Sequence, residues 1–167
     1  MQGKLVVICG IDGSGKTTLQ NNIGSYLETQ NQGYIATRQP TNFYRTNEHV
    51  RKYLDTGETD LSIEAIALFA ACDRLMHIDT VVNPSLENGK WILCDRYVYS
   101  SYAYFKSRGI DEEFTREINK YVPAPDKVIF LELPGNVACE RVLLRDGDTR
   151  KFEEKSIEYM DDGAEEH

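Results

Sequence analysis

The chain has 167 residues, of which 41% are hydrophobic and 28% charged, and its formal net charge is −8. That length suits one domain, and no apolar run reaches the roughly 18 residues of a membrane helix. The opening segment is too short for a signal peptide, so we expect a cytoplasmic protein that does not contact a membrane. The negative charge argues against a nucleic-acid polymer as partner, but a small anionic ligand can bind where cations gather.

Four short apolar segments predict buried strands, separated by segments with helical spacing of apolar residues. In chain order, the predicted strands are residues 4–9, 34–37, 91–94 and 127–133. The polar stretch 39–48 contains Pro40 and few apolar residues, which predicts a surface loop. Strands that alternate with helices imply an α/β fold with a mostly parallel sheet and helices on both faces.

The intervals between these strands predict the helices. The longest helical pattern covers residues 61–82, with Ser62 as its cap and Asn83-Pro84 as an interruption. Asp111-Glu-Glu predicts the charged first turn of a further helix. Asn136 is the predicted cap of the last helix.

The cysteines do not have the spacing of metal ligands. They lie far apart, each within an apolar stretch, and a disulfide framework is not expected in this class of sequence. We therefore predict buried, reduced thiols at Cys9, Cys72, Cys94 and Cys139.

A phosphate-binding loop follows the first strand. The segment Gly10-Ile-Asp-Gly-Ser-Gly15-Lys16-Thr17 matches the pattern G-x-x-x-x-G-K-[ST] in full. Its glycines allow successive backbone N–H groups to point at phosphate oxygens, and the following helix adds its N-terminal partial charge. Lys16 is expected to reach the β- and γ-phosphates, and the Thr17 hydroxyl to hold Mg²⁺. The nucleotide-binding residues predicted here are Gly10, Asp12, Gly13, Ser14, Gly15, Lys16, Thr17 and Thr18.

The dipeptide Asp95-Arg96 follows the third predicted strand, at the edge where open α/β sheets bind ligands. An acid there can reach Mg²⁺ through water, and an arginine can span two phosphates. A strand-end ion pair is the alternative. Beside an intact phosphate loop, we favour metal binding by Asp95 and a catalytic, phosphate-binding role for Arg96.

Three motifs resemble those of thymidylate kinases: Asp95-Arg-Tyr-Val-Tyr-Ser-Ser-Tyr-Ala-Tyr104, Glu64-Ala-Ile-Ala-Leu-Phe-Ala-Ala-Cys-Asp-Arg74, and Leu131-Glu-Leu-Pro134 followed by Ala138-x-x-Arg141. The similarity runs from about residue 4 to residue 153. It implies a three-layer P-loop fold, phosphoryl transfer from ATP-Mg²⁺ to dTMP, and a homodimer that pairs helices including the one carrying Phe69.

The resemblance also implies a base and sugar pocket. Phe69 matches the phenylalanine that stacks on thymine, Arg74 the arginine at the base edge, and Ser101 a polar side chain that reaches the base. Tyr104 matches a tyrosine that crowds the sugar 2′ position and favours deoxyribose. The alternatives are that Phe69 belongs to the core and that Tyr104 is a helix-surface aromatic.

Further residues are assigned to phosphate binding by the same resemblance. Arg38 and Arg96 match residues that hold the monophosphate, Asp12 an acid that binds the sugar 3′-hydroxyl, and Arg141 a residue on the ATP side. Family members with glycine at the position of Gly13 take a catalytic arginine from a lid over ATP.

That lid is expected at about residues 145–153, with Arg145 or Arg150 as the catalytic arginine; a solvated run of charges is the alternative. The kinase domain is predicted to cover residues 1–160, and residues 161–167 an acidic tail. The family's fifth strand is missing from the sequence pattern, which predicts weak preference among donor nucleotides.

The chain also departs from the family after its second strand, where Gln39 replaces the usual glutamate and the glycines of Arg-Glu-Pro-Gly-Gly-Thr are absent. A deoxynucleoside kinase would want a carboxylate base there, and an amide cannot take that proton. The alternatives left open are a kinase of another nucleotide or of a deoxynucleoside, and a non-catalytic nucleotide-binding module.

Overall fold

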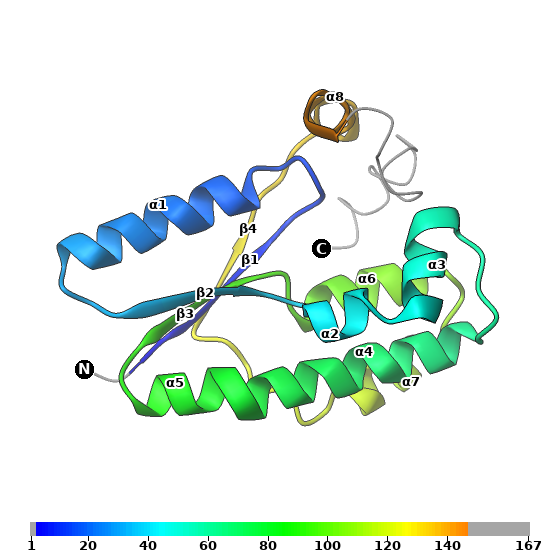
Figure 1. Ribbon diagram of the computed structural model, residues 1–167, viewed down its shortest axis with the longest axis horizontal. Coiled ribbons are helices and arrows are strands. Elements are labelled where there is room, and N and C mark those ends of the chain that lie inside the picture. The colour runs from blue at the N-terminus through cyan, green and yellow to red at the C-terminus, as the bar shows by residue number, and fades with distance from the viewer. Residues whose placement is uncertain (1–2, 147–167) are drawn as a thin grey trace.

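A computed structural model describes residues 3–146 of the chain. Its centre is a four-stranded sheet in the order β2-β3-β1-β4, and every neighbouring pair of strands is parallel (Figure 1). The α/β fold with four strands that the sequence predicts is therefore confirmed. The Arg150 prediction, the acidic tail at 161–167 and all but the start of the predicted lid lie outside the described residues.

The elements follow one another along the chain as strands joined by helical connections. They are β1 (Leu5–Cys9), α1 (Lys16–Thr29), β2 (Tyr34–Arg38), α2 (Asn42–Arg45), α3 (Glu48–Thr56), α4 (Ile63–His77), the π-helical turn η1 (Ile78–Val82), α5 (Asn83–Glu87), β3 (Trp91–Asp95), α6 (Val98–Lys106), α7 (Glu112–Ile118), β4 (Lys127–Phe130) and α8 (Gly135–Asp146).

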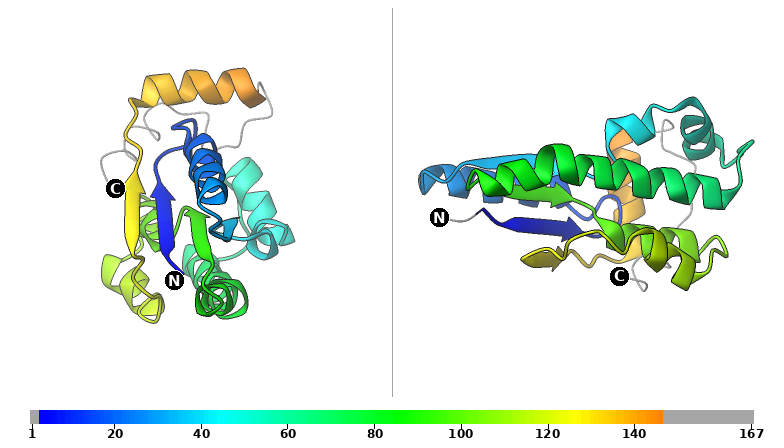
Figure 2. Two further views of the ribbon diagram at one scale, coloured as in Figure 1. Left: turned by 90° about the vertical axis from the view of Figure 1, so that its left-hand side faces the viewer. Right: turned by 90° about the horizontal axis from the view of Figure 1, so that it is seen from below.

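The sheet is covered on both faces, so its central strand is apolar throughout. Successive side chains of a strand point to opposite faces. Leu5 and Val7 of β1 pack in a cluster with Ile78 and Val82, whereas Val6 packs with Leu27 of α1 on the other face. Figure 2 shows α1 on one side of the sheet and α4 on the other.

The long helical connection runs further than the sequence pattern predicts. Ser62 caps α4 by accepting from the backbone N–H of Ala65, as expected. The predicted break at Asn83-Pro84 is wrong, because the turn η1 leads directly into α5. Pro84 lies at the start of α5, where the backbone N–H that proline lacks has no partner within the helix in any case.

Other local expectations need correction. The stretch 39–48 is not simply a surface loop: it contains the short helix α2, and Gln39 is fully buried. The last helix begins at Gly135, so Asn136 lies inside it. All four cysteines are free and Cys9 and Cys94 are buried, as expected, but Cys72 is exposed and Cys139 only half-buried.

The ends of β1 and β3 define where a site can form. Ile8 of β1 pairs with Asp95 of β3, so the loop after β1 and the turn after β3 start side by side. Both lie at the carboxyl edge of the sheet, which α8 crosses in the left view of Figure 2. Open α/β sheets bind ligands at this edge. Among the described residues, no helix is both long and apolar enough to span a bilayer.

Candidate active site

The loop between β1 and α1 has the backbone of a phosphate cradle. Gly10, Gly13 and Gly15 all have positive φ angles, of 139°, 86° and 96°. These conformations suit glycine, which has no Cβ. A Cβ at Gly13 would lie 2.6 Å from the backbone oxygen of Ala138, so α8 packs directly on the loop.

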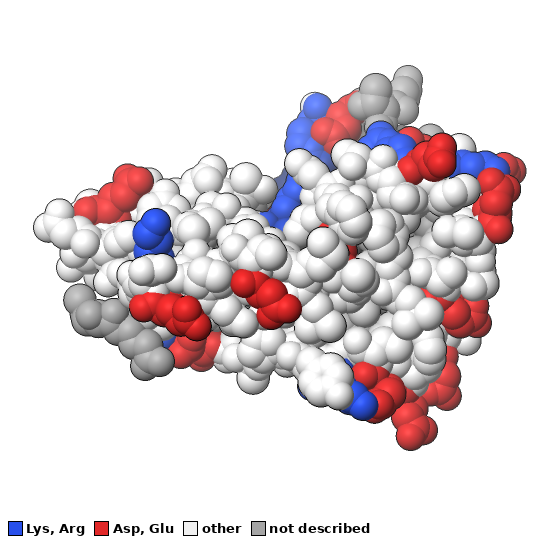
Figure 3. Space-filling model, turned by 60° about the horizontal axis from the view of Figure 1, so that its bottom comes forward, with Lys and Arg blue, Asp and Glu red and all other residues white. Residues whose placement is uncertain are grey.

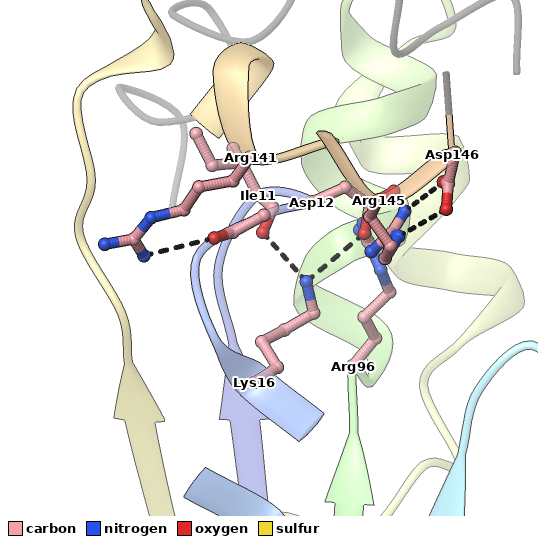
Figure 4. A network of polar contacts seen from close by, with 8 residues as sticks. Ile11, Asp12, Lys16, Arg96, Arg141, Arg145 and Asp146 are labelled. Atoms are coloured by element: carbon pink, nitrogen blue, oxygen red, sulfur yellow. Dashed lines mark hydrogen bonds and ion pairs between the residues drawn. The ribbon is translucent and has the colours of Figure 1, made fainter. Parts of the chain in front are cut away.

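Three charged side chains meet inside this loop (Figure 4). The Lys16 ammonium donates to the Ile11 carbonyl at 2.9 Å and to Asp12 Oδ1 at 3.3 Å, and Arg96 donates to the same Asp12 oxygen at 2.7 Å. Burial lowers the pKa of Lys16, and the charge of Arg96 lowers it further, while Asp12 opposes both. One carboxylate thus lies between two cations at the carboxyl end of the sheet.

Arg96 reaches the loop because its backbone turns sharply. It has a φ angle of 63°, in the left-handed region that is rare for residues other than glycine, and its N–H donates to the Ile8 carbonyl. Such strained residues cluster at functional sites. The turn directs the Arg96 side chain back over the phosphate loop, as the sequence motif predicts.

Two buried oxygens of the site have no hydrogen-bond partner among the described residues: Ser14 Oγ and Asp95 Oδ1. Buried polar atoms normally find partners, so these oxygens are suited to a ligand or its water. Thr17 is exposed at the start of α1. A threonine hydroxyl and a carboxylate are the hard oxygen donors that Mg²⁺ prefers, and such sites rely on nucleotide phosphates for the other ligands. The donor set fits Mg²⁺.

A further arginine, not identified from the sequence, lies at the site. Arg45 of α2 is half-buried and donates from Nε to the Pro40 carbonyl at 2.9 Å; within residues 3–146 its side chain makes no other hydrogen bond or ion pair. Burial lowers its pKa, and the charges of Arg38 and Arg96 lower it further. Arg38 itself is exposed and donates to Asn42. The charges of two other arginines therefore act on Arg45, an arrangement that suits a multiply charged anion.

The family model for thymidylate kinase matches residues 8–166. The chain belongs to the thymidylate kinase family. A probable thymidylate kinase of Pyrococcus abyssi is 40% identical over 156 residues, which are 92% of this chain and 76% of the relative. The thymidylate kinase of Akkermansia muciniphila is 38% identical over 153 residues, 91% of this chain and 72% of the relative. Probable thymidylate kinase 1 of Saccharolobus solfataricus is 39% identical over 153 residues, 91% and 75% of the two chains.

Membership of the thymidylate kinase family confirms the resemblance inferred from the three motifs. The individual residue roles that the resemblance implies stay predictions, and the structure tells where each residue lies. Phe69 and Tyr104 are both half-buried at the edge of one apolar cluster. Phe69 contacts Phe43, which is 55% exposed, edge-on at a centroid distance of 5.3 Å. Arg108 lies over the Tyr104 ring, 3.6 Å from its centroid.

Arg74 and Ser101, the predicted base-binding residues, are both buried. Arg74 is only 1% exposed, and burial lowers its pKa to about 10, so it stays charged at neutral pH. It donates to Gln39, to Asn119 and, at 2.5 Å, to the Ser101 hydroxyl. Gln39, where the family usually has glutamate, is therefore part of the support around the predicted base-binding arginine.

Helix α4 also anchors the segment between β2 and α2, the helix that carries Arg45. Asp73 accepts from the backbone N–H of Thr41 at 2.8 Å and from its hydroxyl, and Thr41 caps α2. The position of Arg45 on α2 thus depends on a carboxylate from α4.

Helix α8 places two arginines near the phosphate loop (Figure 4). Arg141 donates to the Gly13 carbonyl at 3.4 Å, which fits its predicted place on the ATP side. Arg145 forms a paired contact with Asp146, through Nε at 2.7 Å and through NH2 at 2.5 Å.

Proposed function

We propose that this member of the thymidylate kinase family transfers the γ-phosphoryl group of ATP to dTMP, giving dTDP and ADP. The observation that carries the proposal is the junction of Lys16, Asp12 and Arg96, which joins the phosphate loop to the arginines around it. A site that aligns two anionic phosphates needs cations on both sides of the transfer path. Relatives named thymidylate kinase supply the identity of the acceptor.

The residues divide into two groups along the path of transfer. Lys16 and the loop N–H groups bind the β- and γ-phosphates, with Arg141 and a lid arginine, Arg145 or Arg150, on the donor side. Arg38, Arg45 and Arg96 bind the acceptor phosphate. Phe69, Arg74, Ser101 and Tyr104 select the base and deoxyribose, and Asp12 takes the sugar 3′-hydroxyl.

The transfer forms a bond from a dTMP phosphate oxygen to the γ-phosphorus and breaks the bond from that phosphorus to the oxygen bridging to the β-phosphate. The second pKa of a phosphate monoester is about 6, so the acceptor oxygen is already charged at neutral pH and needs no protein base. Thr17 and Asp95 would hold Mg²⁺, which would neutralise part of the charge on the phosphates. The chain's own cations position the two anions and stabilise the charge that spreads in the transition state.

The state of Gln39 supports a nucleotide over a nucleoside as acceptor. Its amide is buried and bonded to Arg74 and His77, so a base for a neutral hydroxyl is absent at this position.

Free thiols and nucleotide substrates both suit a cytoplasmic protein.

The function is tested by ATP consumption with Mg²⁺ and a panel of acceptors: dTMP, dUMP, UMP, dCMP, dGMP, AMP and thymidine. The expected result is turnover led by dTMP. Turnover led by thymidine or another nucleotide would overturn the acceptor assignment. ATP binding without any turnover would favour a non-catalytic nucleotide-binding module.

Replacing Arg45 by glutamine is expected to raise the KM for dTMP about tenfold, because a charged hydrogen bond to the acceptor phosphate is lost. The KM for ATP should change little, since Arg45 lies on the acceptor side. Steady-state kinetics with each substrate varied in turn measures both values. Arg51→Gln is the matched control, because Arg51 pairs with Asp55 on the surface of α3. An unchanged KM for dTMP would remove Arg45 from the site.

We also propose that the protein forms a homodimer through α4. Its outward positions recur every four residues and include Leu68, Cys72 and Met76; Leu68 is 50% and Met76 47% exposed. In Figure 3, which brings this side of the molecule forward, charged side chains lie mainly around a broad uncharged area. Exposed apolar stripes of this kind mark protein interfaces, and the family resemblance assigns this helix to the dimer.

Leu68→Glu is expected to convert the dimer to a monomer, because the substitution buries an uncompensated charge at the interface. Light scattering coupled to size exclusion measures the mass. Tyr26→Glu on α1, where the tyrosine is 63% exposed, is the control that should leave the mass unchanged. A wild-type protein that is monomeric at micromolar concentration would contradict the proposal.

A further inference from the structure

A line of hydrogen bonds runs through the interior from β2 to Arg74. His77 Nε2 lies 2.8 Å from Thr37 Oγ1, and His77 Nδ1 lies 3.0 Å from Gln39 Nε2. Gln39 Oε1 in turn accepts from Arg74 Nε at 3.2 Å. Gln39, Arg74 and His77 are all buried. Each partner in this line is therefore fixed by its neighbours rather than by water.

The directions of these bonds follow from chemistry. The Arg74 guanidinium only donates, so the Gln39 atom that faces it must be the carbonyl oxygen. The other end of the amide is then an NH₂ group, and it must donate to His77. His77 Nδ1 can accept only if it carries no proton. In this state the proton of neutral His77 is on Nε2, which faces the Thr37 hydroxyl.

We propose that neutral His77 is a positioning residue for Arg74, acting through the Gln39 side chain. This inference rests on the proposed function, in which Arg74 recognises the base of dTMP. A proton on Nδ1 would face the Gln39 NH₂ group, placing donor against donor. If the Gln39 amide then turned over, its NH₂ group would face Arg74, again donor against donor. Protonated His77 is therefore incompatible with the Gln39–Arg74 contact, and the guanidinium loses the partner that fixes its Nε.

The charges around His77 agree with a neutral ring. Burial lowers its pKa below the ordinary 6.5, and Asp73, one turn earlier in α4, opposes this shift. Arg74 is linked to His77 through Gln39, and the two side chains that contact the His77 ring, Thr37 at the end of β2 and Gln39 just after it, are uncharged. Beyond Arg74 lie Cys94 and Tyr97, whose pKa values are raised by burial, so both stay protonated at neutral pH.

The sign of the pH effect follows. The affinity for dTMP is fully present above the lowered pKa of His77 and is lost as the pH falls through it. The phosphate of dTMP titrates with a pKa of about 6, in the same range. A comparison between variants at each pH is therefore needed, because the substrate's own titration is common to all of them.

Three variants separate positioning from mere packing. His77→Asn keeps an acceptor oxygen near the position of Nδ1 but cannot be protonated. His77→Leu removes the acceptor. Gln39→Glu offers two acceptors, one for Arg74 and one for a protonated His77, so it should tolerate acid. Circular dichroism and thermal melts at each pH confirm that a variant is folded before its kinetics are compared.

The expected results are specific. His77→Leu raises the KM for dTMP about tenfold at neutral pH, since a buried hydrogen-bond partner is lost, and leaves the KM for ATP unchanged. The wild-type KM for dTMP, divided by that of His77→Asn at the same pH, rises as the pH falls below 6.5. The KM of Gln39→Glu, divided by that of His77→Asn, stays the same across this pH range. A wild-type ratio that does not change with pH, or equal effects on both substrates, would overturn the proposal.

A measurement without substrate tests the same bonds. Nitrogen-15 NMR of the histidines, with His77 assigned by its absence in His77→Asn, should show a neutral ring at pH 7 with the proton on Nε2. A proton on Nδ1 would refute the proposal that His77 accepts from Gln39 and so positions Arg74. If the wild type fails to turn over dTMP, the proposed function falls, and the observed tautomer alone then decides whether His77 orients Gln39.

Discussion

Lys16→Met is expected to lower kcat by a factor on the order of 10³, with a smaller change in the KM for dTMP. The Lys16 ammonium is buried in the phosphate loop and bonded to the Ile11 carbonyl and to Asp12. In the proposed mechanism, this amine meets the charge that develops on the transferred phosphoryl group. Methionine fills a similar volume without a charge, so the substitution removes the interaction rather than the packing.

Steady-state kinetics and single-turnover assays measure this effect, and calorimetry shows whether ATP still binds. Lys52→Met is the matched control, because Lys52 pairs with Asp60 on the surface and should keep wild-type turnover. A Lys16→Met enzyme that retained a tenth of the wild-type kcat would mean that phosphoryl transfer does not depend on this amine.

Arg96→Lys is expected to reduce kcat/KM for dTMP by a factor on the order of 10², although the charge is kept. Arginine presents several N–H groups in a fixed plane, so one nitrogen can hold Asp12 while others hold a phosphate. A lysine ammonium is a single point charge and cannot span both anions in the same geometry. The φ angle of 63° at Arg96 is equally unfavourable for lysine, since both side chains carry a Cβ, so the substitution is expected to leave the local strain nearly unchanged.

The assay is steady-state kinetics at varied dTMP and saturating ATP. Arg51→Lys, on the surface of α3, provides the control for exchanging arginine and lysine. If Arg96→Lys kept kcat/KM within about threefold of the wild type, Arg96 would act only through its charge and the bidentate role would be wrong.

The parts of the site that lie on continuous sequence motifs could be predicted. The phosphate loop and the pair Asp95-Arg96 each follow directly from a strand, and the pairing of β1 with β3 brings them together. A motif of this kind contains its own structural context, because the strand, the turn and the functional residue are adjacent in the chain.

The stretch after β2 could not be predicted, because its structure depends on residues far away in the sequence. Its polarity suggests an exposed loop, but Gln39 is buried by bonds to Arg74 and His77. Thr41, which caps α2, is held by Asp73, 32 positions later. Arg45 was missed for the same reason, since only this tertiary anchoring brings α2 to the phosphate side.

The predicted break at Asn83-Pro84 is wrong for a local reason. A proline usually marks the end of a helix because it lacks an N–H and crowds the preceding turn. Here the wider turn η1 comes first, and Pro84 lies in the first turn of the next helical segment, α5. The sequence pattern alone gives no sign of such a π-helical turn.

The position of Asp12 between Lys16 and Arg96 bears on how the proposed site would select among anions. Because both cations already share an internal carboxylate, an incoming anion must displace it rather than meet two unbalanced charges. A singly charged ion such as chloride gains little from that exchange, whereas a nucleotide phosphate with two charges and several oxygens gains more. With Lys16 on the ATP side and Arg96 on the dTMP side, as proposed above, Asp12 would weaken the binding of singly charged ions at either cation, whereas a nucleotide phosphate would still compete with the carboxylate.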